Sequence, residues 1–456
     1  QKGTALSGSS CSVRGRSGEK HGICYPEQAH MHVVIIGNGI AGTTAARHIR
    51  KLSDCRITMI SDESWQPFSR TALMYIFMGK LKLESTYLYE DWFWEKNRID
   101  RVQARVREVN PAAKNITLGD GSVLSWDKLI LATGSRPVKI GVPGENLPGV
   151  QHLYHLSDLD VLNRLSRGVE CAVVVGGGLT GVELAEMLVS RGIRVTFMVR
   201  EKGLMARQLT PEESNMAGRI IREHGVDLRF GMQIREIRGN GRVESVVTND
   251  GLEIPCGLVG ITAGVAPETA FLYGTGIETD SGVLVDEYLR TSVKDIYAAG
   301  DCAELRTPAP ARRAVEPLWY TARAMGETVA RNVCGNPEPY CQGIWYNSAR
   351  FFETEYQMYG QVPATTPSGI TSLYWEDSSE KKSVRINYDT ATGAVTGFQT
   401  MGIRYRQQVC EHWIATGTHI SGVLKNLSMA NFDPEFYRRF EAEINLLFQQ
   451  KIAELS

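Results

Sequence analysis

The sequence has no run of apolar residues near the roughly 18 that a membrane-spanning helix needs. It has no excess of either charge, with 50 lysines and arginines against 51 aspartates and glutamates, which argues against nucleic acid or an anionic membrane as the main partner. Its nine cysteines form no C-x-x-C pair and no metal-like cluster. We therefore expect no metal site, reduced thiols and a cytoplasmic setting.

Residues 1–30 lack the apolar periodicity of the rest of the chain and are rich in glycine, serine and basic residues. They contain no apolar stretch, so they do not read as a secretory signal. We expect residues 1–30 to form a disordered extension, and Met31, directly before the first strand, is a candidate start of the native chain.

The first motif predicts a dinucleotide site. Val33 to Ile36 form a continuous apolar run, which is typical of a buried parallel strand. Gly37, Gly39 and Gly42 follow in the spacing G-x-G-x-x-G and lead into a helix-forming stretch. The first glycine allows a tight turn, the second lets the backbone approach a pyrophosphate, and the third lets helix and strand pack closely.

An acidic residue is expected where the second strand of this unit ends. The strand from Arg56 to Ile60 is followed by Asp62 and Glu63, about twenty residues beyond Gly42, where an acid meets the ribose 2′-OH of a dinucleotide. We favour Glu63 for this contact and keep Asp62 as the alternative.

The same pattern recurs about 140 residues later, with Gly176, Gly178 and Gly181 between an apolar strand and a helix. Two such motifs are far more specific than one, and they predict two bound dinucleotides. Hydride transfer between a flavin and a nicotinamide is the chemistry that uses both, so we expect FAD and NADH or NADPH.

The choice between NADH and NADPH stays open. The second strand of this unit, Arg194 to Val199, is followed by Arg200 and Glu201. Arg200 suits the 2′-phosphate of NADPH as a bidentate donor, whereas Glu201 suits the 2′-OH of NADH. A solvated Arg200 without a ligand is the third interpretation.

Three further segments carry a family resemblance: WDKLILATGSRP at 126–137, GLVGITAGVAPET at 257–269 and SGVLVDEYLRTSVKDIYAAGDCAE at 281–304. With the two glycine motifs, they make the chain resemble the FAD-dependent pyridine nucleotide-disulfide oxidoreductases over about residues 31–345. The resemblance implies a nicotinamide contact at Gly264. It also implies FAD contacts at Val106, Ala132, Thr133, Gly134, Gly300 and Asp301.

The resemblance also implies an α/β architecture with two Rossmann-like domains and a C-terminal α+β domain. The FAD domain would be split into residues 31–152 and 281–341, and the NAD(P) domain, residues 153–280, would be inserted between them. Residues 342–456 would form the C-terminal domain, which serves in the family as a dimer interface or an acceptor platform.

The branch of the family follows from a missing cysteine pair. The disulfide reductases carry C-x-x-x-x-C soon after the first ribose acid, but residues 64–80 contain no cysteine, so the dithiol–disulfide route is absent there. The run Pro67 to Arg70 instead resembles ferredoxin and rubredoxin reductases and the flavin part of assimilatory nitrite reductase. That resemblance places Arg70 against the FAD phosphates.

One position departs from that branch. A lysine that pairs with a glutamate near flavin N5 is replaced here by Tyr75, whereas the glutamate is kept as Glu183. We expect Glu183, left without its lysine, to have a raised pKa and to orient the nicotinamide, or else to bond with Tyr75. A helix that begins near Pro317 would bring Trp319 to the flavin edge, although ordinary core packing explains a tryptophan there equally well.

The C-terminal domain is predicted to be an antiparallel sheet with flanking helices. Its strands are TSLYW, SVRINYD and AVTGFQTMG, and DTATG supplies a hairpin turn between the last two. A last helix is expected from Asp433 and Pro434. Its apolar face would consist of Phe436, Phe440, Ile444, Leu447 and Phe448. Its polar face has balanced charge, which favours packing on the sheet or on a second subunit over a membrane.

Two functions are consistent with these features. The first is an FAD-dependent NAD(P)H oxidoreductase that passes hydride from nicotinamide to flavin and electrons to an external acceptor, which would be a ferredoxin, a rubredoxin, a quinone or oxygen. The second is a flavin-carrying subunit, or a redox-responsive interaction protein like the relatives of apoptosis-inducing factor, in which the nicotinamide regulates assembly. A homodimer or a subunit of a redox complex fits either one.

Overall fold

The computed structural model describes residues 30–433, 435 and 438–455. The predicted disordered extension, residues 1–30, therefore lies outside the described residues except for His30. By its contacts the chain divides into two units that alternate along the sequence. The first unit comprises residues up to Trp65, Tyr89–Gly134 and Thr269–Gly343, and the second comprises Gln66–Leu88, Ser135–Glu268 and Ile344–Ser456.

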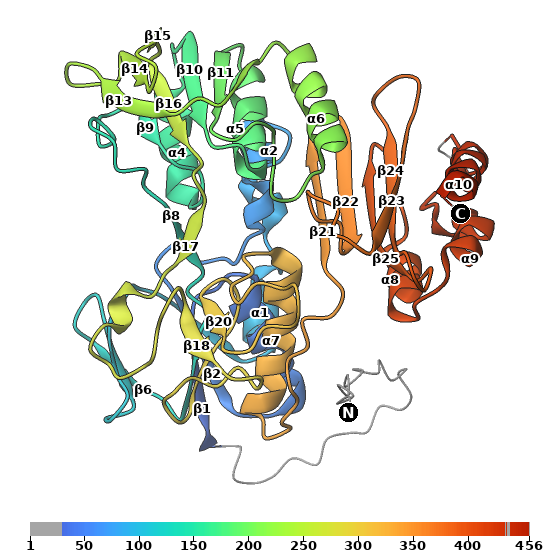
Figure 1. The fold of residues 1–456 in the computed structure, drawn as a ribbon. Helices are drawn as coiled ribbons and strands as arrows, with labels where there is room; N and C mark the ends of the chain where they lie inside the picture. The colour runs from blue at the N-terminus through green and yellow to red at the C-terminus, as the bar shows by residue number, and fades with distance from the viewer. Residues whose placement is uncertain (1–29, 434, 436–437, 456) are drawn as a thin grey trace, which may run out of the picture. The chain divides into compact units, whose positions relative to one another are not determined.

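The first unit is built on a five-stranded parallel sheet. Its central strand is buried because helices α1 (Ile40–Leu52) and α7 (Trp319–Val333), which lie side by side in Figure 1, share its apolar core. The strand order is β19 (Ile296–Ala298), β7 (Lys128–Leu131), β1 (His32–Ile36), β2 (Arg56–Ser61) and β3 (Ile99–Gln103). The predicted strands at 33–36 and 56–60 are confirmed by β1 and β2.

The first unit also carries smaller elements around this sheet. Helix α3 (Asp91–Lys96) packs next to β3. A three-stranded antiparallel sheet consists of β4 (Val106–Asn110), β5 (Asn115–Leu118) and β6 (Val123–Ser125), and a parallel pair consists of β18 (Val283–Val285) and β20 (Ala303–Leu305).

The second unit repeats the parallel architecture. The order of its first sheet is β12 (Asp227–Phe230), β11 (Arg194–Val199), β10 (Cys171–Val175), β16 (Leu258–Ile261) and β9 (Val150–Gln151). Its helices are α2 (Leu73–Phe77), α4 (Leu156–Leu165), α5 (Leu179–Val189) and α6 (Pro211–Glu223). Short antiparallel elements are the sheet of β13 (Ile234–Arg238), β14 (Ser245–Thr248) and β15 (Glu253–Pro255), and the pair β8 (Ser135–Pro137) and β17 (Val265–Pro267).

A five-stranded antiparallel sheet, here called the third sheet, completes the second unit. Its order is β21 (Tyr346–Phe351), β22 (Thr354–Gly360), β25 (Val395–Met401), β24 (Ser383–Asp389) and β23 (Ile370–Glu376). The three predicted strands of the C-terminal domain are confirmed as β23, β24 and β25. Strands β21 and β22 form an antiparallel hairpin at the start of this sheet.

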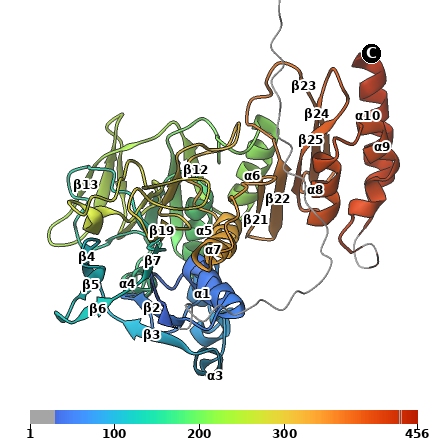
Figure 2. The same ribbon diagram turned by 90° about the horizontal axis from the view of Figure 1, so that it is seen from below.

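The two faces of the third sheet have different partners. Helices α8 (Gln407–Ala415), α9 (Ile420–Lys425) and α10 (Glu441–Leu455) lie on one face, and α6 lies on the other (Figures 1 and 2). Strand alternation explains this division. Val384 and Ile386 of β24 join the apolar core beneath α8 to α10, whereas Ser383 and Arg385 point to the opposite face, where α6 lies.

The start of the last helix was predicted wrongly. Asp433 and Arg438–Phe440 are not helical, and α10 begins at Glu441. Asn431, which donates a side-chain hydrogen bond to the Glu441 carboxylate over 2.7 Å, ties the preceding loop to the true start of the helix. The predicted packing of the helix is confirmed, since Phe440, Ile444 and Phe448 are buried in the core of the third sheet. Phe436 lies outside the described residues.

Within the described residues, no helix has both the length and the apolar character that crossing a membrane requires.

Two substitutions on α10 test its packing. Ile444 is fully buried and Leu446 is 62% exposed, so the two side chains differ in environment but scarcely in chemistry. We expect Ile444→Ala to cost about 2–5 kcal/mol of the free energy of unfolding, because it leaves a cavity. Leu446→Ala, the matched control, should change it by no more than about 0.5 kcal/mol. Urea unfolding followed by tryptophan fluorescence measures both, and equal effects would contradict the burial of Ile444.

Candidate cofactor sites

The first glycine turn, residues 37–42, closes on itself so tightly that two of its glycines are obligatory. Gly37 has φ +111°, and a Cβ there would lie 2.0 Å from the Ala132 carbonyl oxygen. A Cβ on Gly42 would lie 2.0 Å from the Gly37 carbonyl oxygen. Gly39 is different, because its Cβ would meet no atom within 4 Å. The glycine motif predicts that a pyrophosphate approaches the backbone at this open position.

The helix that follows keeps its positive end available. Gly39 is the N-cap of α1, no side chain caps the helix, and its first turn contains no acidic residue. Gly178 is likewise the N-cap of α5, which has no side-chain cap and no acidic residue in its first turn. The first amide N–H groups of a helix have no intrahelical acceptor, and the helix dipole favours a negative charge there. Both helix N-termini therefore fit a phosphate group.

The other predicted FAD contacts gather at the same edge of the first sheet. The backbone N–H of Ala132 donates to Ile36 over 2.8 Å, and that of Ala299 donates to Leu131 over 2.9 Å. The carboxyl ends of β1, β7 and β19 are therefore aligned, and the segments that follow these strands begin at the same edge of the sheet. Predicted residues at this edge are Gly37, Gly39, Ala132, Thr133, Gly134, Gly300 and Asp301. Ligands of open parallel sheets bind at the carboxyl ends of the strands, so this arrangement fits FAD.

The loop after β2 carries both candidate ribose acids. Asp62 is exposed and Glu63 is half-buried, and the backbone N–H of Glu63 donates to the Ser61 hydroxyl over 3.2 Å. Sequence reasoning missed Asn38, which is buried and donates from its amide to the Ser64 carbonyl over 2.7 Å. Asn38 thereby fixes the first glycine turn to the loop of the acids. The sequence feature that could have identified Asn38 is its position as a polar residue between two glycines of the motif.

Two other predicted FAD residues have ordinary structural surroundings. Val106 is the first residue of β4 and is buried in the core of the first unit. Trp319 is the first residue of α7, is half-buried, and meets the Tyr320 ring edge-on at 5.3 Å between centroids. Core packing accounts for the burial of Val106.

Arg70 lies in the second unit and is held firmly. Its guanidinium stacks over the Tyr154 ring at 4.5 Å and over the Phe68 ring at 5.4 Å, and it donates to the Tyr154 carbonyl. The Tyr154 hydroxyl in turn accepts the backbone N–H of Ser135 over 3.0 Å. Arg70 is thus a positioned cation and not a solvated surface side chain.

The second glycine turn, residues 176–181, has the same geometry as the first. A Cβ on Gly176, at φ +113°, would lie 2.3 Å from the Thr262 carbonyl oxygen, and one on Gly181 would lie 2.1 Å from the Gly176 carbonyl oxygen. Gly178 again faces open space. Sequence reasoning missed Thr262, whose hydroxyl donates to the Val175 carbonyl over 2.7 Å and so closes the turn from the neighbouring strand.

The two residues that would select the nicotinamide cofactor are paired with each other. Arg200 donates to the Glu201 carboxylate over 2.8 Å, and this hydrogen bond lowers the pKa of Glu201. Both side chains lie at the surface, where such a pair is weak and opens readily. Either partner is therefore available for a ribose substituent. Gly264, the predicted nicotinamide contact, has φ +112° and faces open space.

Glu183 lies in an environment that disfavours its ionised form. Burial raises its pKa to about 8, and the nearby Glu186 carboxylate adds to the shift. Burial also raises the pKa of Tyr75, with Glu186 and Glu183 adding to it and Arg350 opposing it. These three side chains form one electrostatic cluster with Arg350. Among the described contacts no hydrogen bond joins Tyr75 to Glu183.

Glu186 anchors this cluster to the third sheet. Its carboxylate accepts the backbone N–H of Phe352 over 2.6 Å and lies 4.0 Å from the Lys80 ammonium. Phe352 has φ +48°, which is unusual for a bulky residue and costs energy. The bond to Glu186 and the burial of the Phe352 ring hold that conformation.

Two glycine turns that are open at their second glycine define a protein that binds two dinucleotides. The family model of pyridine nucleotide-disulphide oxidoreductases matches residues 31–326, and the chain belongs to this family. It is an FAD-dependent NAD(P)H oxidoreductase.

Two relatives and one solved structure illustrate the match. The chain is 31% identical over 358 residues to rhodocoxin reductase from Rhodococcus erythropolis, which covers 75% of this chain and 83% of that protein. It is 28% identical over 367 residues to the NAD(P)H nitrite reductase of Bacillus subtilis, covering 80% of this chain but 45% of that protein, so it spans less than half of that relative. A ferredoxin reductase structure from Rhodopseudomonas palustris matches with a TM-score of 0.75 at 26% identity, covering 82% of this chain and 91% of that one.

The two open glycines provide a matched pair of variants. Gly39 and Gly178 have φ −66° and −86°, which alanine tolerates, so each alanine variant should lose no more than about 1 kcal/mol of stability. We expect Gly39→Ala to weaken FAD binding, and Gly178→Ala to weaken ADP-ribose binding, by about tenfold or more, since each methyl group fills the space of a pyrophosphate. Flavin retention and calorimetric titration measure the two affinities. Each variant is the control for the other, and loss of the same ligand in both would contradict the assignment.

The raised pKa of Glu183 predicts a particular pH dependence of stability. A carboxyl group whose pKa is raised on folding stabilises the folded state below its unfolded value, and this contribution disappears as the pH rises towards about 8. Glu183→Gln stays neutral, so its free energy of unfolding should not show this decline. Between about pH 5 and about pH 9 we expect the wild type to lose on the order of 1–3 kcal/mol relative to Glu183→Gln.

Thermal unfolding over this pH range measures the effect. Glu170→Gln, which changes a glutamate with an exposed side chain, should follow the wild-type curve. Parallel curves for the wild type and Glu183→Gln would show that Glu183 ionises at an ordinary pH.

Proposed function

We propose that the enzyme passes electrons from NADH or NADPH through FAD to a small electron-transfer protein of the ferredoxin or rubredoxin class. The open space above Gly39 and Gly178 carries this proposal, because it provides both dinucleotide sites. The absence of cysteine from residues 64–80 supports it further, since a dithiol–disulfide exchange has no group to use there. Two relatives support this choice of acceptor, since one is named a rhodocoxin reductase and the other, from Pseudomonas putida, a rubredoxin-NAD(+) reductase.

In this proposal the FAD domain is residues 31–152 with 281–341, the NAD(P) domain is residues 153–280, and the interface domain is residues 342–456. The pairing of β19 with β7 supports the split FAD domain, because it returns a late segment to the sheet of β1. The separate sheet of β10, β11 and β16 supports the inserted domain.

In this proposal each group of residues has a role in binding one of the two cofactors. The first glycine turn, Glu63 or Asp62, and Arg70 bind FAD, and the second glycine turn with Arg200 or Glu201 binds the nicotinamide nucleotide. FAD supplies the ability to accept a hydride and to release electrons singly. Glu183, neutral near pH 7, orients the carboxamide of the nicotinamide as a hydrogen-bond donor without adding a negative charge.

We also propose a cytoplasmic enzyme that forms a homodimer or joins a larger redox complex. The cysteines of the described segments are free thiols, in keeping with a reducing compartment. The third sheet and its helices offer the interface, since Met429, Phe432 and Leu446 leave large apolar side chains exposed there.

Reduction of the flavin under anaerobic conditions tests the function. We expect NADH or NADPH to bleach the flavin absorbance band, and the reduced enzyme to reduce a [2Fe–2S] ferredoxin or a rubredoxin many times per flavin. A small disulfide, used as the control acceptor, should not be reduced, because the cysteine pair is absent. If neither nucleotide bleaches the flavin, the proposal fails. Bleaching followed by disulfide reduction would place the enzyme in the other branch.

A further inference from the structure

We propose that Arg385 of the third sheet positions the loop that binds the adenosine half of the nicotinamide cofactor. This loop, residues 200–210, joins β11 to α6 and carries Arg200 and Glu201. The inference rests on the proposed function, because it assigns the second glycine turn to NAD(P)H. It adds a residue from another part of the fold to that site.

The 200–210 loop is folded back onto the second glycine turn. The backbone N–H of Met205 donates to the Gly177 carbonyl over 2.7 Å, and a Cβ on Gly177 would lie 2.4 Å from the Val199 side chain. Met205 has φ +46°, a left-handed conformation that costs energy for this residue type. Its surroundings must therefore hold it in place, and any shift of the loop moves the backbone of the glycine turn.

The far end of the loop is tied to the start of α6. Thr210 is the N-cap of α6, and its hydroxyl contacts the carboxylates of Glu212, over 2.9 Å, and of Glu213. Within the loop, the side chains of Leu204 and Leu209 are buried. The loop is thus held at two places, the glycine turn and the first turn of α6.

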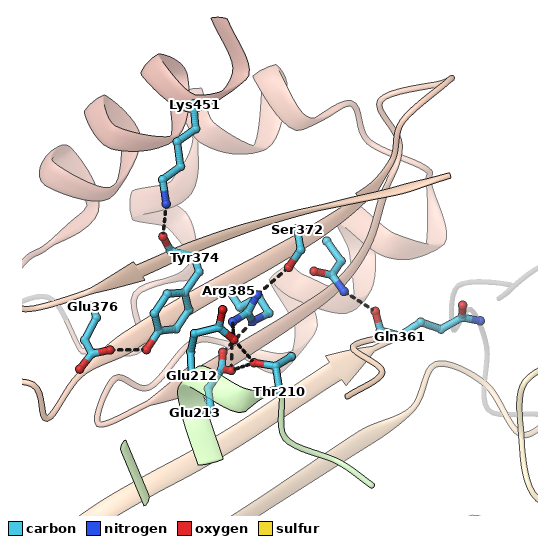
Figure 3. A network of polar contacts seen from close by, with 10 residues as sticks. Thr210, Glu212, Glu213, Gln361, Ser372, Tyr374, Glu376, Arg385 and Lys451 are labelled. Atoms are coloured by element: carbon cyan, nitrogen blue, oxygen red, sulfur yellow. Dashed lines mark hydrogen bonds and ion pairs between the residues drawn. The ribbon is translucent and has the colours of Figure 1, made fainter. Parts of the chain in front are cut away.

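Arg385 fixes this first turn of α6 to the third sheet (Figure 3). Its guanidinium donates to Glu213 over 2.8 and 3.1 Å and to Glu212 over 3.0 Å. The Ser372 hydroxyl accepts a further bond over 2.8 Å, and the Tyr374 ring lies 4.6 Å below the guanidinium. Figure 3 shows both glutamates and Thr210 pointing to Arg385 from the α6 side.

Because this ion pair is buried, the loss of either partner cannot be compensated by water. The Glu213 side chain is fully buried and that of Arg385 is 5% exposed, so water cannot replace either partner. Removing Arg385 leaves an uncompensated buried carboxylate, which must move towards water or take up a proton. Either response releases the first turn of α6 and, with it, Thr210 and the loop.

Other ion pairs between α6 and the third sheet do not have this consequence. Arg219 pairs with Glu376 and with Glu380, and Glu223 pairs with Lys381 over 2.8 Å. These pairs are more exposed, so each contributes little to stability. They also lie on later turns of α6, farther along the chain from the 200–210 loop, and Arg219 provides a matched control.

The experiment compares Arg385→Met, Arg385→Lys and Arg219→Met in the FAD-loaded protein. We expect Arg385→Met to raise the Kd for ADP-ribose and the KM for the nicotinamide nucleotide about tenfold, while kcat stays within about twofold. Arg385→Lys keeps the charge and should recover most of the affinity. Arg219→Met should bind ADP-ribose like the wild type. Calorimetric titration gives Kd, and the flavin spectrum reports that each variant is folded.

Three results would overturn the inference: wild-type ADP-ribose affinity in Arg385→Met, an equal loss in Arg219→Met, or a fall in kcat with unchanged KM. If Arg385→Met does not fold, Glu212→Gln decides, because its half-exposed side chain makes it a mild change. We expect Glu212→Gln to weaken ADP-ribose binding about threefold, and wild-type affinity in Glu212→Gln would overturn the inference. Failure of the wild type itself to bind ADP-ribose would instead contradict the proposed function.

Discussion

The close approach of a strand end to a helix start is the constraint on which both cofactor sites depend. At Gly42 and at Gly181 the start of the helix passes the carbonyl oxygens of Gly37 and Gly176 at a distance that excludes any side chain. A glycine loses more conformational entropy on folding than other residues do. In return, the turn directs the first amide groups of a helix to one point. Gly39 and Gly178 then leave that point open. One packing requirement therefore produces the fold and the candidate phosphate site together.

Buried carboxylates are the second organising feature. They lie where helices α5 and α6 meet the third sheet, within the second unit. Glu186 accepts the backbone of Phe352, and Glu213 binds Arg385, so two helices of the nucleotide-binding sheet are each fixed to the third sheet. Such pairs add little net stability compared with apolar packing, but they tolerate few alternative arrangements. The third sheet thereby determines where α5 and α6 lie, and those helices carry Glu183 and the end of the 200–210 loop.

Local patterns predicted most of the fold because the relevant forces are local. The two glycine turns follow from backbone sterics, and the strands β23 to β25 follow from residue alternation. The start of α10 was wrong for a related reason. Asp433 and Pro434 are a good start of a helix by local preference, but Arg438–Phe440 are not helical, and the tertiary bond from Asn431 to Glu441 marks the actual start. The packing of segment 66–88 with the second unit had no local signal at all.

The cofactor sites show the same division between local and distant information. Asn38 and Thr262 support the glycine turns, and only the first has a signal within its own motif. Arg385 lies 175 residues beyond the end of the 200–210 loop in the sequence (385 − 210), and no spacing rule connects them. Its proposed role rests on three structural observations: the left-handed backbone of Met205, Thr210 at the N-cap of α6 and a fully buried Glu213. Each fact alone has an ordinary explanation, but together they run from the 200–210 loop into the first turn of α6, and for that reason we propose that a distant guanidinium positions this loop.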